Sequence, residues 1–217
     1  MRKAFLTAIL MSAAVCVSAQ SGIIRELIGD VELRPAGAAA FTRASAGSAV
    51  AQDTIVSTGL RSTAIIEIGS ATLTVRPLTR LSLAEITAAA GTENISVNLQ
   101  AGRVRVDVRP PAGTMASFTV QSPMAVASVR GTSFEFDAHS VTVHEGSVIF
   151  RGGRGAQVMV RAGGESTVAV GGRAADPAQT IFQNLSPSLP VGMGYSGELL
   201  LVPLMPTGDI VINITFE

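Results

Sequence analysis

The chain has 217 residues, of which 47% are hydrophobic and 15% are charged, and its formal net charge is zero. The hydrophobic share is ample for a folded core, while the balanced charge gives no polycation and argues against nucleic-acid binding. Gly, Val, Thr and Ala are abundant and aromatic residues make up only 4% of the chain. This composition is typical of a fold with many short strands and turns.

Residues 1–19 have the features of a secretory signal peptide. Arg2 and Lys3 form a basic start, Ala4–Val15 is an apolar stretch, and the segment ending at Ala19 offers small residues for cleavage. We therefore expect cleavage after Ala19 and a periplasmic or otherwise exported protein. Its formal charge would be −2, from 14 basic and 16 acidic side chains.

Cys16 is the only cysteine, and it allows lipoprotein processing as an alternative. That processing needs a small residue just before the cysteine, where this chain has Val15, so lipidation is the less favoured expectation. If cleavage follows Ala19, the mature chain has no cysteine and therefore no disulfide.

Apolar and polar residues alternate with a period of two through most of the chain after the signal segment. This period is the signature of half-buried strands. It places strands at Val31–Leu33, Asp53–Thr58, Ala64–Ile68, Leu73–Val75, Leu81–Leu83, Ile95–Leu99, Val104–Val108, Phe134–Phe136, Val141–Val143, Val158–Val160 and Val168–Val170. Two stretches lack this period. We expect residues 38–47 to form a small-residue loop, and Ala84–Ala90 to form a helical turn or, as the favoured alternative, a loop excursion.

Strands about ten residues apart with Gly turns predict an all-β fold. We expect many short antiparallel strands in a jelly-roll or β-sandwich-like domain. A flattened β-solenoid is the second choice, because no strict repeat length emerges. After the N-terminal stretch, no apolar run is long enough to cross a bilayer as a helix.

Turn and linker residues divide the rest of the chain. We expect a β domain over residues 20–173, a Pro- and Ser-containing linker over 174–190, and a C-terminal β-hairpin over 191–217. The hairpin would pair Leu199–Val202 with the alternating stretch Ile210–Phe216. It would pack on a sheet edge or offer a strand to a partner.

The centre of the chain carries a series of spaced motifs. The main ones are Ser122-Pro123, Val129-Arg130-Gly131-Thr132 followed by Phe134, and Val141-x-Val143-x-Glu145-Gly146-x-Val148. Upstream lie Asp53-Thr54-Ile55-x-Ser57-Thr58-Gly59, Gly69-Ser70, Pro77-x-Thr79-x-Leu81 and Leu99-x-Ala101-Gly102-Arg103-Val104. In this order they resemble the FecR domain, over roughly Ile24–Gly172. Ile68 is a departure, since the resemblance calls for Asp before Gly69-Ser70.

The resemblance implies an extracytoplasmic module. In the regulators that carry it, the FecR domain relays the state of an outer-membrane transporter to a cytoplasmic sigma factor. That pathway needs a cytoplasmic segment and a membrane span, and neither is expected here, so only recognition in the envelope is carried over. The motif residues Ser122, Pro123, Arg130, Gly131, Thr132, Phe134, Glu145 and Gly146 are expected to be structural. Arg130 would staple two strands through a carboxylate or loop carbonyls.

Arg103, Arg105 and Arg109 are the candidate binding residues. With Asp107 they are expected on one strand face, as a basic stripe for an anionic ligand. The alternative is a solvated face whose charges discourage edge pairing, and that interpretation is favoured.

We find no motif for catalysis, metal or cofactor binding. His139 and His144 are five residues apart, and on an extended strand they would point to opposite faces, so they would not converge on a metal. There is no Gly-x-Ser-x-Gly, Walker or dinucleotide motif. With no Trp and only Tyr195, the aromatic platform of a carbohydrate site is also missing.

The sequence therefore predicts an exported, non-enzymatic module without cofactor. It would serve protein–protein recognition or signalling in the cell envelope, with an envelope protein as partner. The alternative is a structural or self-assembling envelope component that binds cell-wall material. The oligomeric state is left open.

Overall fold

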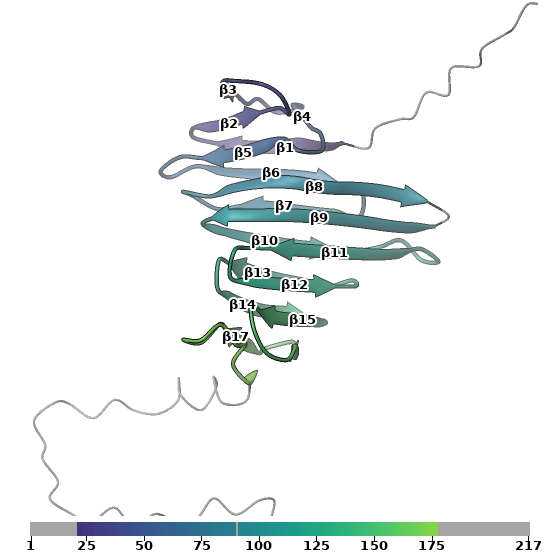
Figure 1. The fold of residues 1–217 in the computed structure, drawn as a ribbon. Helices are drawn as coiled ribbons and strands as arrows, with labels where there is room; N and C mark the ends of the chain where they lie inside the picture. Colours follow the sequence, from purple (N-terminus) through teal and green to yellow (C-terminus); the bar gives the residue numbers. More distant parts are fainter. Residues whose placement is uncertain (1–20, 90, 178–217) are drawn as a thin grey trace, which may run out of the picture. The chain divides into compact units, whose positions relative to one another are not determined.

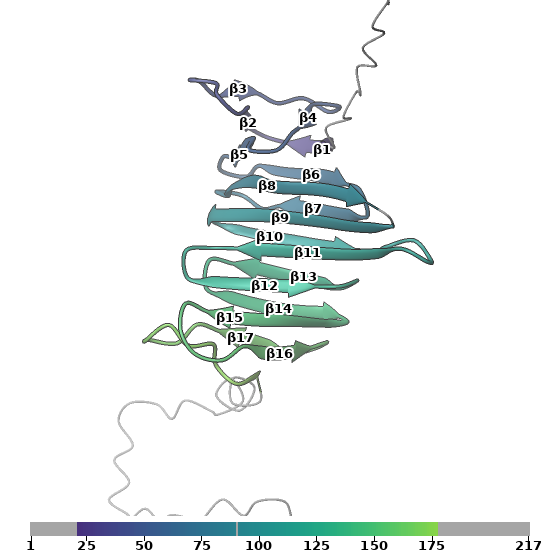
Figure 2. The same cartoon turned by 45° about the vertical axis from the view of Figure 1, so that its right-hand side comes forward.

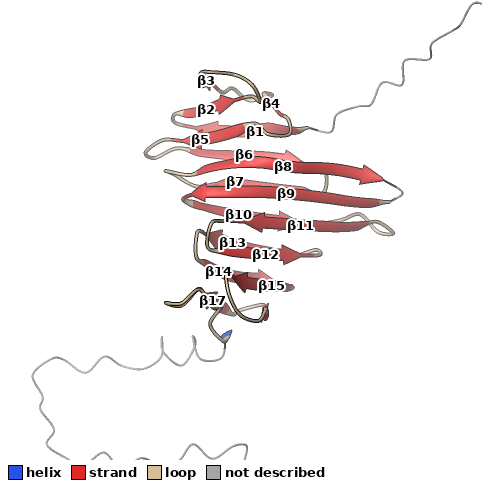
Figure 3. Cartoon of the chain, in the orientation of Figure 1, coloured by secondary structure: helices blue, strands red, loops and turns tan. Residues whose placement is uncertain are grey.

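The computed structural model describes residues 21–89 and 91–177, all within one compact unit. The expected signal segment, the expected hairpin over 191–217 and most of the expected linker lie outside these residues. The described chain is almost entirely β, and its strands form two large sheets that face each other across one core (Figure 1, Figure 3). The all-β sandwich that the sequence predicts is confirmed.

The first sheet, sheet A, has eight strands. In spatial order they are β17 (Glu165–Thr167), β14 (Ser140–Glu145), β13 (Ser133–Asp137), β10 (Arg103–Val108), β7 (Ala71–Val75), β6 (Thr63–Ile68), β1 (Gly22–Ile28) and β4 (Ala49–Val50). All of its neighbouring strands run antiparallel.

The second sheet, sheet B, has nine strands. In spatial order they are β16 (Val158–Arg161), β15 (Ser147–Gly152), β12 (Ala125–Val129), β11 (Met115–Gln121), β9 (Thr92–Ala101), β8 (Arg80–Ala89), β5 (Ile55–Thr58), β2 (Val31–Arg34) and β3 (Thr42–Arg43). Within it, β9 and β11 form a parallel pair, because β10 crosses to sheet A between them.

Successive hairpins alternate between the two sheets. The hairpin β6–β7 lies in sheet A, β8–β9 in sheet B, β13–β14 in sheet A and β15–β16 in sheet B. Each one is placed beside the earlier strands of its own sheet, so strand order follows sequence order along the stack (Figure 1, Figure 2). The exceptions are β3 and β4, which lie outside β2 and β1. The sandwich shares this progressive order with the flattened solenoid that was the second choice.

The core lies between the sheets and is filled by the inward side of each strand. In β6 and β7 every second residue is buried, with Ile66 and Leu73 fully inaccessible. Phe136 of sheet A meets Phe150 of sheet B edge to face, with ring centroids 6.4 Å apart. Such aromatic pairs stabilise a fold beyond the area that they bury. The period-two pattern in the sequence is therefore the packing pattern of this core.

The stretch Ala84–Ala90 was expected as a helical turn or a loop, and this is wrong for the part that is described. β8 runs unbroken from Arg80 to Ala89 and pairs with β9 along its length. A β-bulge between Leu83 and Glu85 shifts the register, so that Leu83 and Ile86 are both buried. The bulge breaks the period of two, which hid the strand from sequence reasoning.

Three other expectations need correction. A strand, β1, precedes Val31–Leu33, and its alternation is also interrupted by a bulge, between Ile24 and Glu26. The expected loop over 38–47 contains the short strand β3. The expected strand Val168–Val170 is displaced, because β17 ends at Thr167, Val168 forms only an isolated bridge to Ala174, and Val170 is fully exposed.

Buried hydroxyl groups tie the sheets together where the chain crosses from β7 to β8. The Thr58 hydroxyl of β5 accepts from the backbone N–H of Thr79 at 3.0 Å and donates to the carbonyl of Arg76 at 2.6 Å. The Thr79 hydroxyl accepts from the N–H of Arg103 at 3.0 Å. Buried polar groups must be paired in this way, so Thr58 and Thr79 hold a crossover between the sheets.

The turn after Ile68 has an unexpected source of stability. Glu93, from β9 of the other sheet, accepts hydrogen bonds from the N–H of Ser70 at 3.0 Å and from its hydroxyl at 2.5 Å. Gly69 has φ +52, and a Cβ there would overlap the Glu93 carboxylate. A carboxylate from sheet B therefore caps the turn in which Ile68 replaces the expected Asp.

Within residues 21–89 and 91–177, no helix is long and apolar enough to cross a membrane.

Candidate functional site

Ser122 and Pro123 form the corner between β11 and β12. The buried Ser122 hydroxyl accepts from the N–H of Ala125 at 2.9 Å and donates to the carbonyl of Ala138 at 2.6 Å. Ala138 lies in the turn between β13 and β14 of sheet A. One hydroxyl thus joins a turn of each sheet, which accounts for Ser at this position by structure alone.

The Arg130-Gly131-Thr132 corner is held by Thr132. Its hydroxyl donates to the carbonyl of Ser147 at 3.0 Å, and its own carbonyl accepts from the N–H of Val108 at 3.0 Å. Gly131 has φ +74, a backbone conformation that favours glycine. Arg130 is exposed and forms no ion pair with any residue that the structure describes, so the expected arginine staple is wrong. The short hydroxyl of Thr132 reaches the neighbouring strand without leaving the core.

The remaining motif residues frame the same corner. Phe134 is fully buried in the core, while Glu145 is exposed where β14 ends. Gly146 has φ +79, and a Cβ there would lie only 3.0 Å from the carbonyl oxygen of Gly131. The Glu145-Gly146 turn and the Arg130-Gly131 corner therefore pack against each other, and a side chain at Gly146 would push them apart.

The three candidate binding arginines do not form a basic stripe. Arg103 pairs with Asp137 at 3.5 Å, and Arg105 pairs with Asp107 at 3.4 Å. β10 ends at Val108, so Arg109 lies beyond the strand. The face is a set of neutralised pairs, and an anionic ligand would have to compete with these carboxylates.

Asp137 also organises the turn between β13 and β14. Its carboxylate accepts from the backbone N–H groups of His139 at 3.0 Å and Ser140 at 2.8 Å. Burial raises the pKa of Asp137, but these hydrogen bonds from His139 and Ser140 outweigh it, and the pKa lies below its usual value. Asp137 therefore stays ionised and holds the turn rather than acting as a proton donor.

The histidines do not meet. His139 lies in that turn, with its Nδ1 atom 3.4 Å from Oδ1 of Asp137. His144 is exposed on β14. In the part of the chain that the structure describes, no three His, Cys, Asp or Glu side chains are grouped so that they could hold a metal ion.

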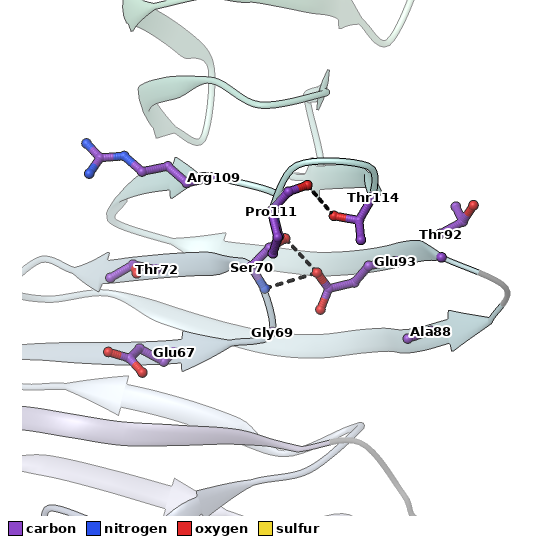
Figure 4. Close-up of a pocket in the computed structure, with 11 residues that line it drawn as sticks. Glu67, Gly69, Ser70, Thr72, Ala88, Thr92, Glu93, Arg109, Pro111 and Thr114 are labelled. Atoms are coloured by element: carbon purple, nitrogen blue, oxygen red, sulfur yellow. Dashed lines mark hydrogen bonds between the residues drawn. The ribbon is translucent and has the colours of Figure 1, made fainter.

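A pocket of about 590 Å³ lies beside the capped turn (Figure 4). It is lined by Gly69-Ser70, the ends of β8 and β9, and the Arg109–Thr114 loop. Its central carboxylate, Glu93, is engaged by Ser70, and the Arg109 guanidinium points away from it. The Glu93 carboxylate of this pocket thus serves the turn.

A different surface has unpaired charge. We call the outward residues of β15 and β16, namely Ile149, Arg151, Met159 and Arg161, the β15–β16 face. Ile149 and Met159 lie opposite each other in the register and are 42% and 57% exposed. None of the ion pairs between described residues involves Arg151 or Arg161. On this face two apolar side chains lie between two free guanidinium groups.

A groove of about 310 Å³ adjoins this face. Ser122, Pro123 and Met124 form one wall, and Arg151, Arg154 and the glycines around them form the other. No carboxylate is among the residues that line it. The structural motif Ser122-Pro123 thus also shapes an arginine-lined groove.

The β15–β16 face was missed by sequence reasoning, although a signal was present. From Gly146 to Gly164 the chain holds three arginines and no acidic residue. Which of them would share a face, and whether a distant carboxylate would pair with them, depends on register and on the opposing sheet. The sequence does not contain that information.

These features define a two-sheet, all-β module whose central motif residues are structural. Residues 45–149 match the family model described as FecR protein. The chain therefore carries a FecR domain, as the motifs around Ser122-Pro123 and Arg130-Gly131-Thr132 predict. The FecR domain supports a signalling or regulatory role for the chain.

Two solved structures resemble this chain, both described as a candidate anti-sigma factor from Parabacteroides distasonis ATCC 8503. One, at 1.65 Å resolution, has 15% identity and a TM-score of 0.46, and the match covers 60% of this chain and 64% of that one. The other, at 2.50 Å, has 15% identity and a TM-score of 0.45, with 59% and 62% covered. The chain thus spans less than two thirds of the solved chains that it matches. No curated protein matches it.

Proposed function

We propose that this chain is an exported, non-enzymatic FecR module that binds a protein partner in the cell envelope through the β15–β16 face. The FecR domain supports the regulatory role, and the residues 1–19 support export. The observation that carries the site is the pair of exposed apolar residues, Ile149 and Met159, between unpaired arginines. Apolar centres with a charged rim are typical of protein interfaces.

The position of this face at a sheet edge supports the same function. Among the described strands, β16 is the last of sheet B, with a neighbour on one side only. A pocket of about 480 Å³ lies beside it, lined by Met159, Arg161 and the Ala162–Gly164 turn, with Asp176 and Pro177. A free edge and a hollow next to it can accept an added strand.

The test is site-specific photo-crosslinking in the cells that make the protein. A crosslinking residue replaces Met159, and the matched control replaces Leu78, which is equally exposed at 60% but lies far along the chain. We expect one envelope protein to be captured from position 159 and not from position 78. Equal capture from both positions would overturn the proposed site. A product at twice the mass of the processed chain would favour the self-assembling alternative instead.

Export has a separate test. We expect the protein recovered from the periplasmic fraction to begin at Gln20, as measured by intact mass and N-terminal sequencing. The physical reason is that the apolar stretch Ala4–Val15 engages the export machinery and Ala19 precedes the cleaved bond. A protein that starts at Cys16 with a lipid attached, or one that keeps Met1 in the cytoplasm, would contradict the expectation.

A further inference from the structure

The β15–β16 face has an order of charges that specifies a ligand. In the register, Arg161 lies opposite Ser147 and Met159 lies opposite Ile149. Arg151 follows Ile149 by two residues on the same outward side of β15. Along the strand axis the face therefore reads basic, apolar, basic.

The backbone separation of Arg151 and Arg161 suits two anionic groups on one extended ligand. Ser147 and Arg151 are four residues apart on an extended strand, which corresponds to about 13 Å. Arg161 lies beside Ser147, so Arg151 and Arg161 are separated by about the same length at their backbones. With both side chains extended along their strands, each guanidinium group can engage an anionic group of its own. Carboxylates on an extended chain, four residues apart, have the matching separation.

Several arginines on and beside sheet A differ from Arg151 and Arg161, because each is paired with a carboxylate. On and beside sheet A, Arg76 pairs with Glu135 and Arg103 pairs with Asp137. The groove next to the face adds Arg154 without any lining carboxylate. Asp176, which lines the pocket beside β16, already has an interaction of its own. Three arginines without an ion pair to a described residue, Arg151, Arg154 and Arg161, thus lie on this face and its adjoining groove.

From these observations we infer that β16 accepts an extended acidic peptide segment of a protein partner as an added strand. The segment has an acidic residue at i, an apolar residue at i+2 and an acidic residue at i+4, which face Arg161, the Met159–Ile149 pair and Arg151. Backbone hydrogen bonds to the edge of β16 supply affinity, and the alternating side chains supply specificity. This inference rests on the proposed function and names the partner chemistry of the same face.

The experiment uses fluorescence anisotropy with the chain from Gln20 to Glu217. The probe is a labelled peptide, Thr-Glu-Thr-Val-Thr-Glu-Thr, with its two Glu four residues apart. The control is Thr-Glu-Thr-Thr-Glu-Val-Thr, which has the same composition and charge but puts the two Glu on opposite sides of a strand. We expect the first peptide to bind at least five-fold more tightly. Equal binding of both would overturn the inference.

Two arginine variants test the contacts. Exposed ion pairs are worth about 0.2–1 kcal/mol, so Arg151→Ala and Arg161→Ala should each weaken the first peptide by roughly two- to five-fold. Arg61→Ala, at an exposed arginine in the N-terminal half, should leave it unchanged. The double reversal Arg151→Glu with Arg161→Glu should instead prefer the peptide with Lys in place of Glu. This charge reversal also tests whether the double variant is folded, since an unfolded variant would bind neither the Glu peptide nor the Lys peptide.

Two further outcomes separate the explanations. If inorganic phosphate at millimolar concentration displaces the peptide from the chain, the face is a simple anion site and the inference fails. If the crosslink at position 159 captures an envelope protein while no acidic peptide binds, the proposed function stands and only the peptide chemistry is wrong.

Discussion

Replacing Phe136 by alanine is expected to lower the free energy of unfolding by about 3–5 kcal/mol. Phe136 is fully buried in sheet A and contacts Phe150 of sheet B edge to face. Its removal leaves a cavity between the two sheets, and strands held by ladders on both sides cannot collapse to fill it. Chemical denaturation followed by circular dichroism measures the change.

Phe41→Ala is the control for this substitution. Phe41 is only half-buried and lies beneath the guanidinium groups of Arg34 and Arg80, 5.1 and 5.7 Å from its ring centroid. An exposed cation–π contact is worth about 0.5–1 kcal/mol, so the loss should be several-fold smaller. Equal losses for Phe41→Ala and Phe136→Ala would contradict the assignment of the core.

The second large effect is expected for Gly102→Ala, in the turn between β9 and β10. Gly102 has φ +88, and a Cβ there would lie 2.5 Å from the Cα of Thr79 and 2.7 Å from the carbonyl oxygen of Leu78. Both are backbone atoms, so no side-chain rotation relieves the overlap. Backbone strain and overpacking together cost about 2–5 kcal/mol. The shift would also break the hydrogen bond from Arg103 to the Thr79 hydroxyl.

Gly37→Ala is the control that separates backbone strain from overpacking in the stability loss of Gly102→Ala. Gly37 has a similar φ of +76, but a Cβ there meets nothing within 4 Å. Its substitution should cost only the left-handed backbone strain, about 1–2 kcal/mol. Thermal unfolding of both variants gives the difference. If Gly37→Ala is as damaging as Gly102→Ala, the close approach to Thr79 is not what the glycine protects.

The residues of the candidate site are harder to predict from the sequence than the fold class, because they depend on which strands become neighbours. Arg103 and Arg105 look like a basic stripe in the sequence, because nothing in it says that Asp137 will lie opposite Arg103. Arg151 and Arg161 were not among the candidate residues, although neither forms an ion pair with a described residue. Ion pairing is decided by which strands become neighbours, and that choice is not local.

The motif residues also show that local features can be predicted from the sequence while contacts between distant segments cannot. The need for glycine at Gly131 and Gly146 follows from turn chemistry and is visible in the sequence. The partner of Thr132 is not visible, since its hydroxyl bonds to Ser147, fifteen residues away at the start of β15. Arg130 seemed the better staple because arginine offers more donors, but it faces solvent.

The sequence by itself determined that the chain is all-β, where most strands lie, and that it carries a FecR domain. These properties depend on local alternation, Gly turns and spaced motifs, which act over a few residues. The tertiary structure alone decided the bulge that makes β8 one strand, the capping of Ser70 by Glu93, and the free charge of the β15–β16 face. Each of these depends on register and on contact between strands far apart in the chain, where a shift of one residue exchanges the two faces.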